Sequence, residues 1–115
     1  MKQPTFFLSH GGGPWPWMDG DFRQGHAKLE AALQAVPASL PEAPRAILMI
    51  SAHWEEAAFT VMTAPHPGML YDYGGFPAHT YEVVYPAPGD PVLAERVVAL
   101  IEAARLPAEI GRAHV

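Results

Sequence analysis

Two short apolar runs, each leading into a histidine, restrict how this chain can fold. Thr5–Ser9 runs into His10 and three glycines, and Arg45–Ser51 is followed by a turn that carries His53. Apolar and β-branched runs without polar alternation are typical of strands covered on both faces, as in a parallel sheet. Between them, Phe22–Val36 has apolar residues at helical spacing. This order predicts a strand–helix–strand unit and an α/β fold.

Later segments add to the predicted sheet and helices. Ala58–Thr63 alternates in the manner of a third strand, and Tyr81–Tyr85 is expected to form a short strand. Asp90 is a favourable N-cap and Pro91 a favourable first residue for a second helix, which is expected to end near Arg105. We therefore predict a central, mostly parallel sheet flanked by helices.

The predicted sheet is incomplete. The 115-residue chain has room for about one domain. A further strand would be expected after the second helix, yet the residues from Ala108 onward show almost no strand pattern.

Charge and composition exclude several classes of protein. The net charge is −5 and there is no basic cluster, which argues against binding to nucleic acid. The absence of cysteine excludes disulfide scaffolds, thiolate zinc sites and cysteine nucleophiles. The longest apolar run, Ala46–Ile50, is too short to cross a membrane. The N-terminus shows no signal pattern, so a cytoplasmic location is expected.

His10 and His53 are the candidate metal ligands. Each follows the carboxyl end of a predicted buried strand, where ligands collect in open α/β sheets. Imidazole suits zinc, iron and copper. Two histidines alone do not complete a site, because catalytic metals usually have three protein ligands. The alternative is that both are ordinary loop histidines, and Glu55 and Glu56 nearby are expected to be solvated.

An aromatic loop at Tyr71–Pro77 is the second candidate region. Tyr73 and Phe76 are predicted to wall a flat, apolar substrate. Asp72 is a candidate to orient a metal-bound histidine through the other ring nitrogen. The alternative, equally open at this point, is that the loop only covers the core.

The remaining aromatic and histidine residues are expected to have structural roles. Trp15 and Trp17 lie between prolines and are expected to hold down the first loop. His26 is expected on a helix surface, and His66 and His79 are expected to be solvated or locally bonded.

Four segments together resemble the class III extradiol ring-cleavage dioxygenases, in particular the bacterial DOPA 4,5-dioxygenase-like branch. They are Phe7–Pro14, Ile50–Trp54, Tyr71–Pro77 and Tyr85–Ala94. The resemblance implies an α/β fold and a divalent metal, Fe²⁺ or Zn²⁺, with His10 and His53 among its ligands. It also implies a catechol substrate, opened next to its two hydroxyls with both atoms of O₂.

The chain departs from this family in its length. Members of the family are longer, and their third metal ligand and an acid/base histidine lie in the second half, beyond residue 109 of this numbering. We therefore expect residues 1–109 to be the N-terminal part of the catalytic domain, inactive alone. Residues 110–115 are expected to be an artefactual tail, with a genuine short tail as the alternative.

Two other functions remain open from the sequence. One is a zinc-dependent hydrolase or isomerase on the same scaffold, acting through metal-activated water. The other is a small non-enzymatic α/β module that binds a partner through the aromatic loop.

Overall fold

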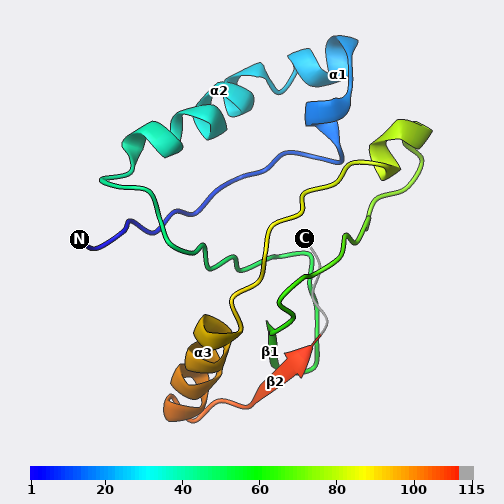
Figure 1. Ribbon diagram of the computed structural model, residues 1–115. Coiled ribbons are helices and arrows are strands. Elements are labelled where there is room, and N and C mark those ends of the chain that lie inside the picture. Colours follow the sequence, from blue (N-terminus) through cyan, green and yellow to red (C-terminus); the bar gives the residue numbers. More distant parts are fainter. Residues whose placement is uncertain (112–115) are drawn as a thin grey trace. The chain divides into compact units, whose positions relative to one another are not determined.

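The computed structural model describes residues 1–111, which form two compact units. Unit 1 comprises residues 1–47 and 73–82, and unit 2 comprises residues 48–72 and the described residues from 83 onward. Helices, one small sheet and long irregular segments follow one another along the chain (Figure 1). Residues 112–115, which belong to the predicted tail, lie outside the described residues.

Unit 1 contains only helices among its regular elements. They are the 3-10 helices η1 (Trp15–Trp17), η2 (Pro37–Ser39) and η3 (Ala78–Tyr81), and the α-helices α1 (Gly20–Gln24) and α2 (Ala27–Ala35). The helix predicted over 22–36 is therefore present as two helices with a break between them.

His26 lies at this break and bonds across it. In a continuous helix its backbone N–H would bond to the Phe22 carbonyl four residues earlier. Instead, the His26 backbone N–H donates to the Arg23 carbonyl at 2.9 Å. The Phe22 carbonyl is hydrogen-bonded by His26 Nδ1 at 2.8 Å. The side chain thus replaces the backbone N–H as the partner of that carbonyl at the end of the first helix.

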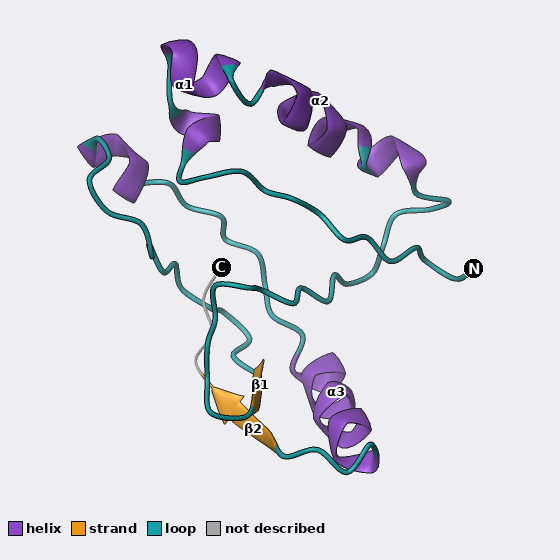
Figure 2. Cartoon of the chain, turned by 180° about the vertical axis from the view of Figure 1, so that it is seen from behind, coloured by secondary structure: helices purple, strands orange, loops and turns teal. Residues whose placement is uncertain are grey.

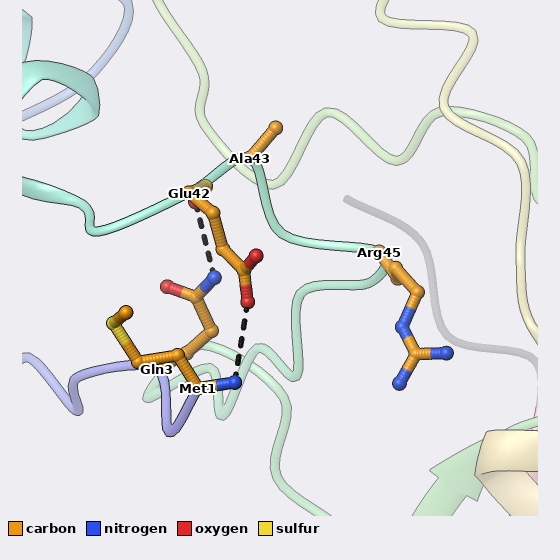
Figure 3. Close-up of a pocket in the computed structure, with 5 residues that line it drawn as sticks. All are labelled: Met1, Gln3, Glu42, Ala43 and Arg45. Atoms are coloured by element: carbon orange, nitrogen blue, oxygen red, sulfur yellow. Dashed lines mark hydrogen bonds and ion pairs between the residues drawn. The ribbon is translucent and has the colours of Figure 1, made fainter.

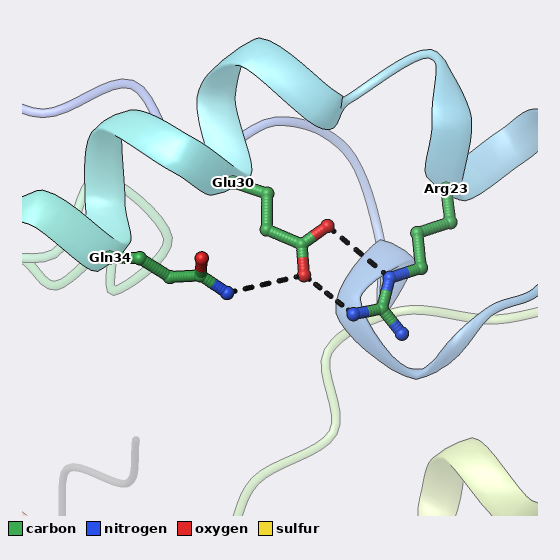
Figure 4. Close-up of polar contacts among 3 residues, drawn as sticks. All are labelled: Arg23, Glu30 and Gln34. Atoms are coloured by element: carbon green, nitrogen blue, oxygen red, sulfur yellow. Dashed lines mark hydrogen bonds and ion pairs between the residues drawn. The ribbon is translucent and has the colours of Figure 1, made fainter.

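A salt bridge connects α1 and α2 across the break. The Arg23 guanidinium contacts the Glu30 carboxylate through two nitrogens, at 2.5 and 3.3 Å, and Gln34 donates to the same carboxylate at 3.5 Å (Figure 4). The hydrogen bond from Arg23 lowers the pKa of the Glu30 carboxyl below its ordinary value and raises the pKa of Arg23. The two short helices are therefore joined by charge on their exposed side.

The core of unit 1 is small and centred on Trp15. Its side chain is 3% exposed, and its indole stacks on the His26 ring with the centroids 5.0 Å apart and the planes within 3°. Pro14, next to Trp15 in sequence, and Thr80, in η3, are also buried in this unit. His26 is therefore a packing residue at a helix junction, and the prediction of an exposed position on a helix is wrong.

Unit 2 is a small βαβ arrangement. β1 (Phe59–Met62) and β2 (Ala108–Gly111) pair in parallel, with Phe59 opposite Ala108. α3 (Pro91–Ala103) lies between them in sequence and packs against both strands (Figure 1). The α/β class with a parallel sheet is confirmed, with two strands in the described part of the chain.

α3 forms where local signals predict it. The Asp90 carboxylate accepts the Leu93 N–H at 2.9 Å, which satisfies one of the unpaired donors of the first turn. Ala94, the most enclosed apolar residue of the helix, is 6% exposed. Just beyond the helix, Arg105 adopts a positive φ of 61°, as residues after a helix end often do. The predicted helix and the strand at 58–63 are both confirmed.

Three predicted strands are wrong. Residues 5–9 and 45–51 are not in any strand and their large apolar side chains are exposed, Ile50 at 89%. Tyr81 ends the helix η3, and residues 82–85 are irregular. A strand needs a paired neighbour to satisfy its backbone groups, and these runs have none within residues 1–111. Figure 2 shows the long loops that result.

The sequence pattern did not predict β2, although a strand was expected at this point in the chain. The helix–strand order required a strand here, but Ala108–Gly111 lacks the apolar run that would mark one. Its last two residues, Ile110 and Gly111, pair with Val61 and Met62 and belong to the segment predicted to be a tail. The boundary at residue 109 stays a prediction. Within residues 1–111 no helix has the length and apolar content needed to span a bilayer.

Candidate functional site

The loop that carries His10 is closely packed in unit 1. Trp15 Nε1 donates to the His10 carbonyl at 2.7 Å. Gly11 has a φ of +74°, and a Cβ added there would lie 2.7 Å from both the Trp15 indole and the His26 ring. Only glycine suits that backbone and that space. The prediction that Trp15 holds down the first loop is confirmed, while the His10 residue itself is exposed.

Phe76 from the aromatic loop packs onto this same first loop. Gly13 has a φ of +57°, and a Cβ at this position would overlap the Phe76 ring. The Phe76 ring also lies 6.0 Å from Phe22, centroid to centroid. The structure thus brings one of the two predicted substrate contacts against the segment that carries His10.

Tyr73 supports Phe76 from the side. The two rings meet edge to face at 5.7 Å, and Tyr73 also lies 5.2 Å from the Tyr81 ring. The Tyr73 hydroxyl donates to the Thr80 carbonyl, so part of this side chain serves the structure of the loop. The substrate roles of Tyr73 and Phe76 stay predictions.

His53 lies in unit 2 and is held at two points. Its Nδ1 lies 2.7 Å from Asp72 Oδ2, and its backbone N–H donates to Ser51 Oγ at 3.1 Å. The His53 side chain is 56% exposed and that of Asp72 42%. A carboxylate beside a histidine ring is the arrangement expected of Asp72 from the sequence. Ser51 was not singled out there, although its spacing two residues before His53 suits a hydroxyl that fixes a turn.

The residues after His53 attach this turn to the sheet. Trp54 Nε1 donates to the Glu56 carboxylate at 2.9 Å. A Cβ added at Gly111, the last residue of β2, would lie 3.0 Å from the Trp54 ring and would overlap the Thr60 methyl. Glu56 is therefore bonded to an indole, and Glu55 is exposed as expected.

The two candidate ligands lie in different compact units, His10 in unit 1 and His53 in unit 2. Their convergence on one cation stays a prediction. Within residues 1–111, no three His, Asp or Glu side chains gather into a group that could hold a metal ion.

Other histidines have their own contacts or lie at the surface. His79 is exposed, in agreement with the expectation of a solvated position, and its Nε2 also contacts the Trp17 carbonyl at 2.8 Å, 62 positions earlier. His66 is exposed.

A cavity of about 340 Å³ in unit 1 has none of the predicted site residues in its wall. It is lined by Met1, Gln3, Glu42, Ala43 and Arg45 (Figure 3). The N-terminal amine lies 3.5 Å from the Glu42 carboxylate, and Gln3 donates to the Glu42 carbonyl at 3.0 Å. These contacts attach the N-terminal segment of the chain to residue 42.

Comparison with known proteins identifies a matching family and several relatives. Residues 4–114 match the family described as "Catalytic LigB subunit of aromatic ring-opening dioxygenase". The chain is 44% identical to dioxygenase tasH of Hapsidospora irregularis, with 87% of this chain and 32% of the relative covered. It is 35% identical to the 4,5-DOPA dioxygenase extradiol of Escherichia coli (strain K12), covering 87% of the chain and 34% of the relative.

A third relative has a similar level of sequence identity to this chain. The 4,5-DOPA dioxygenase extradiol of Portulaca grandiflora is 36% identical, over 96% of the chain and 41% of the relative. The chain therefore spans between about a third and two fifths of the length of the curated relatives that it matches.

Proposed function

Because the chain belongs to the family of the catalytic LigB subunit of aromatic ring-opening dioxygenases, we propose that it contributes to a metal-dependent extradiol dioxygenase. The substrate would be a catechol-type aromatic ring, and the co-substrate O₂. The observation that carries this proposal is the family match over residues 4–114, which takes in both His10 and His53. It favours ring opening over the zinc hydrolase and the non-enzymatic module.

The donor set around His53 suits a divalent metal. His10 and His53 would be the ligands, and neutral imidazole is a good ligand for both iron and zinc. The carboxylate of Asp72 beside His53 Nδ1 is the usual companion of a metal-bound histidine. When bound, ferrous iron would supply the electron exchange with O₂ that ring opening requires, whereas zinc has no redox chemistry.

The aromatic residues of unit 1 would hold the substrate. Phe76 packs on the loop of His10 at Gly13, and an aromatic side chain there could contact a flat ring. Tyr73 packs against Phe76 through an edge-to-face contact. The proposed third metal ligand and the acid/base group are not assigned to any residue of this chain.

A chimera tests the proposal. This chain would replace the matched segment of the Escherichia coli relative, so that the remaining part of a family member is present. Metal content and O₂ uptake with a catechol substrate would then be measured. We expect the parent chimera to hold about one metal per chain, and His10→Ala or His53→Ala to lose both the metal and the activity.

The matched control is His66→Ala, an exposed histidine from the same chain. It should keep both properties. Full metal occupancy in both the His10 and His53 variants would refute the ligand assignment, and turnover without O₂ would refute the dioxygenase.

A further inference from the structure

We infer that Asp72 is a positioning residue that holds His53 in the form with its proton on Nδ1, so that Nε2 is the nitrogen directed to a metal. This inference deepens the proposed function and rests on the assignment of His53 as a ligand. It concerns the geometry of one side-chain pair within unit 2.

The chemistry of the contact determines which nitrogen carries the proton. An ionised carboxylate has only acceptor oxygens. At 2.7 Å from Asp72 Oδ2, His53 Nδ1 must therefore donate, and it carries the hydrogen. In a neutral imidazole the lone pair is then on Nε2, which is the form that binds a metal through that atom.

The segment that carries Asp72 is anchored within unit 2 by Tyr71. Tyr71 is half-buried, and its phenol donates to the Val83 carbonyl of the same unit. The backbone immediately before Asp72 is thus fixed by a hydroxyl, which limits the freedom of the carboxylate to leave the histidine ring.

The histidine is fixed from its own side as well. Ser51 Oγ accepts the His53 backbone N–H, which sets the turn from which the ring projects. With the backbone and Nδ1 both fixed, the direction of Nε2 follows from the ring geometry. Such pre-organisation lowers the entropy that a ligand loses when a metal binds.

The pair has little value as a stabilising device. Both side chains are about half exposed, and ion pairs in that setting contribute little to stability because water screens them. A short contact held from both sides therefore points to orientation of the ring rather than to stabilisation of the fold.

The test uses the 115-residue chain with ¹⁵N-labelled histidine. Long-range ¹H–¹⁵N correlation spectra at pH about 8.5, where imidazole is neutral, report which nitrogen of His53 carries the proton. Zinc affinity is measured separately by competition with a coloured chelator. We expect the Nδ1–H signature in the parent chain.

Asp72→Ala should shift His53 towards the Nε2–H form preferred by free imidazole and weaken zinc binding by about 10- to 100-fold. Asp72→Asn keeps an acceptor oxygen but adds an N–H donor, so the Nδ1–H signature should be weaker than in the parent chain. Glu55→Gln removes one negative charge two residues from His53 and should change neither measurement. Circular dichroism of the helices shows that each variant is folded.

The outcomes separate the inference from its premise. An Asp72→Ala chain that keeps the Nδ1–H signature overturns the positioning role and leaves the proposed function in place. A His53→Ala chain that binds zinc as tightly as the parent overturns the ligand assignment, and with it the premise of this inference.

Discussion

The tip of the Phe76 ring lies against Gly13, where an added Cβ would overlap the ring carbon Cζ. This contact joins the aromatic loop to the loop of His10 within unit 1. Gly13 also has a φ of +57°, which L side chains rarely adopt.

Gly13→Ala is therefore expected to destabilise unit 1 by about 1–3 kcal/mol, because it adds backbone strain and displaces Phe76. Urea unfolding followed by near-ultraviolet circular dichroism measures this. The matched control is Gly12→Ala, where a Cβ meets no atom within 4 Å and the φ is not in the strained range. Equal stability of the two variants would show that Phe76 does not pack on Gly13.

Trp15 allows the hydrogen bond to the first loop to be separated from packing. Trp15→Phe keeps an aromatic ring against His26 but loses the N–H that binds the His10 carbonyl. We expect a loss of about 1 kcal/mol for Phe and about 3–5 kcal/mol for Trp15→Ala, which also empties the core. Trp17→Phe, at a half-exposed indole, is the control and should be close to neutral. If the Phe and Ala variants were equally stable, packing of the indole would contribute nothing.

Local sequence signals predicted those elements that depend on local contacts. α3 begins where Asp90 caps the first turn, and β1 falls inside the alternating segment 58–63. Trp15 also fulfils its expected role, because its indole binds the His10 carbonyl. Asp72 lies beside His53, as the sequence suggested, while its role toward a metal-bound histidine stays a proposal.

Elements that depend on distant partners were not predictable in the same way. The runs at 5–9 and 45–51 have strand-like composition, but a strand exists only when a neighbour completes its hydrogen bonds. β2 shows the converse, because a segment with little apolar character pairs with β1. The helix break at His26 was also not predictable. The His26 ring binds the Phe22 carbonyl, and the spacing of apolar residues gives no sign of such a side-chain contact.

Glu30 gives a prediction about pH. Its pKa is lowered in the folded chain by the hydrogen bond and charge of Arg23. The unfolded chain therefore binds the proton more tightly, so the contribution of this pair is complete above the ordinary pKa of about 4.3 and is lost as pH falls below it. ¹³C NMR titration of the Glu30 carboxyl measures the midpoint directly.

Arg23→Gln should move that midpoint upward towards the ordinary value. High salt should reduce the difference between the two chains, because the pair is exposed to solvent. A midpoint that is the same in both chains would mean that the salt bridge across the α1–α2 break does not form in solution.

Gly111 tests whether β2 is part of the fold, since it lies in the segment that the sequence marks as a tail. A Cβ there would overlap the Thr60 methyl and press on the Trp54 ring, so Gly111→Ala should destabilise unit 2 by about 1–3 kcal/mol through overpacking. Gly74→Ala, where a Cβ meets no atom within 4 Å, is the matched control. Amide hydrogen exchange at Val61 and Met62 gives a second measurement, because these residues pair with Ile110 and Gly111. If Gly111→Ala changes neither stability nor hydrogen exchange, residues 110 and 111 do not pair with β1. That result would support the predicted boundary at residue 109.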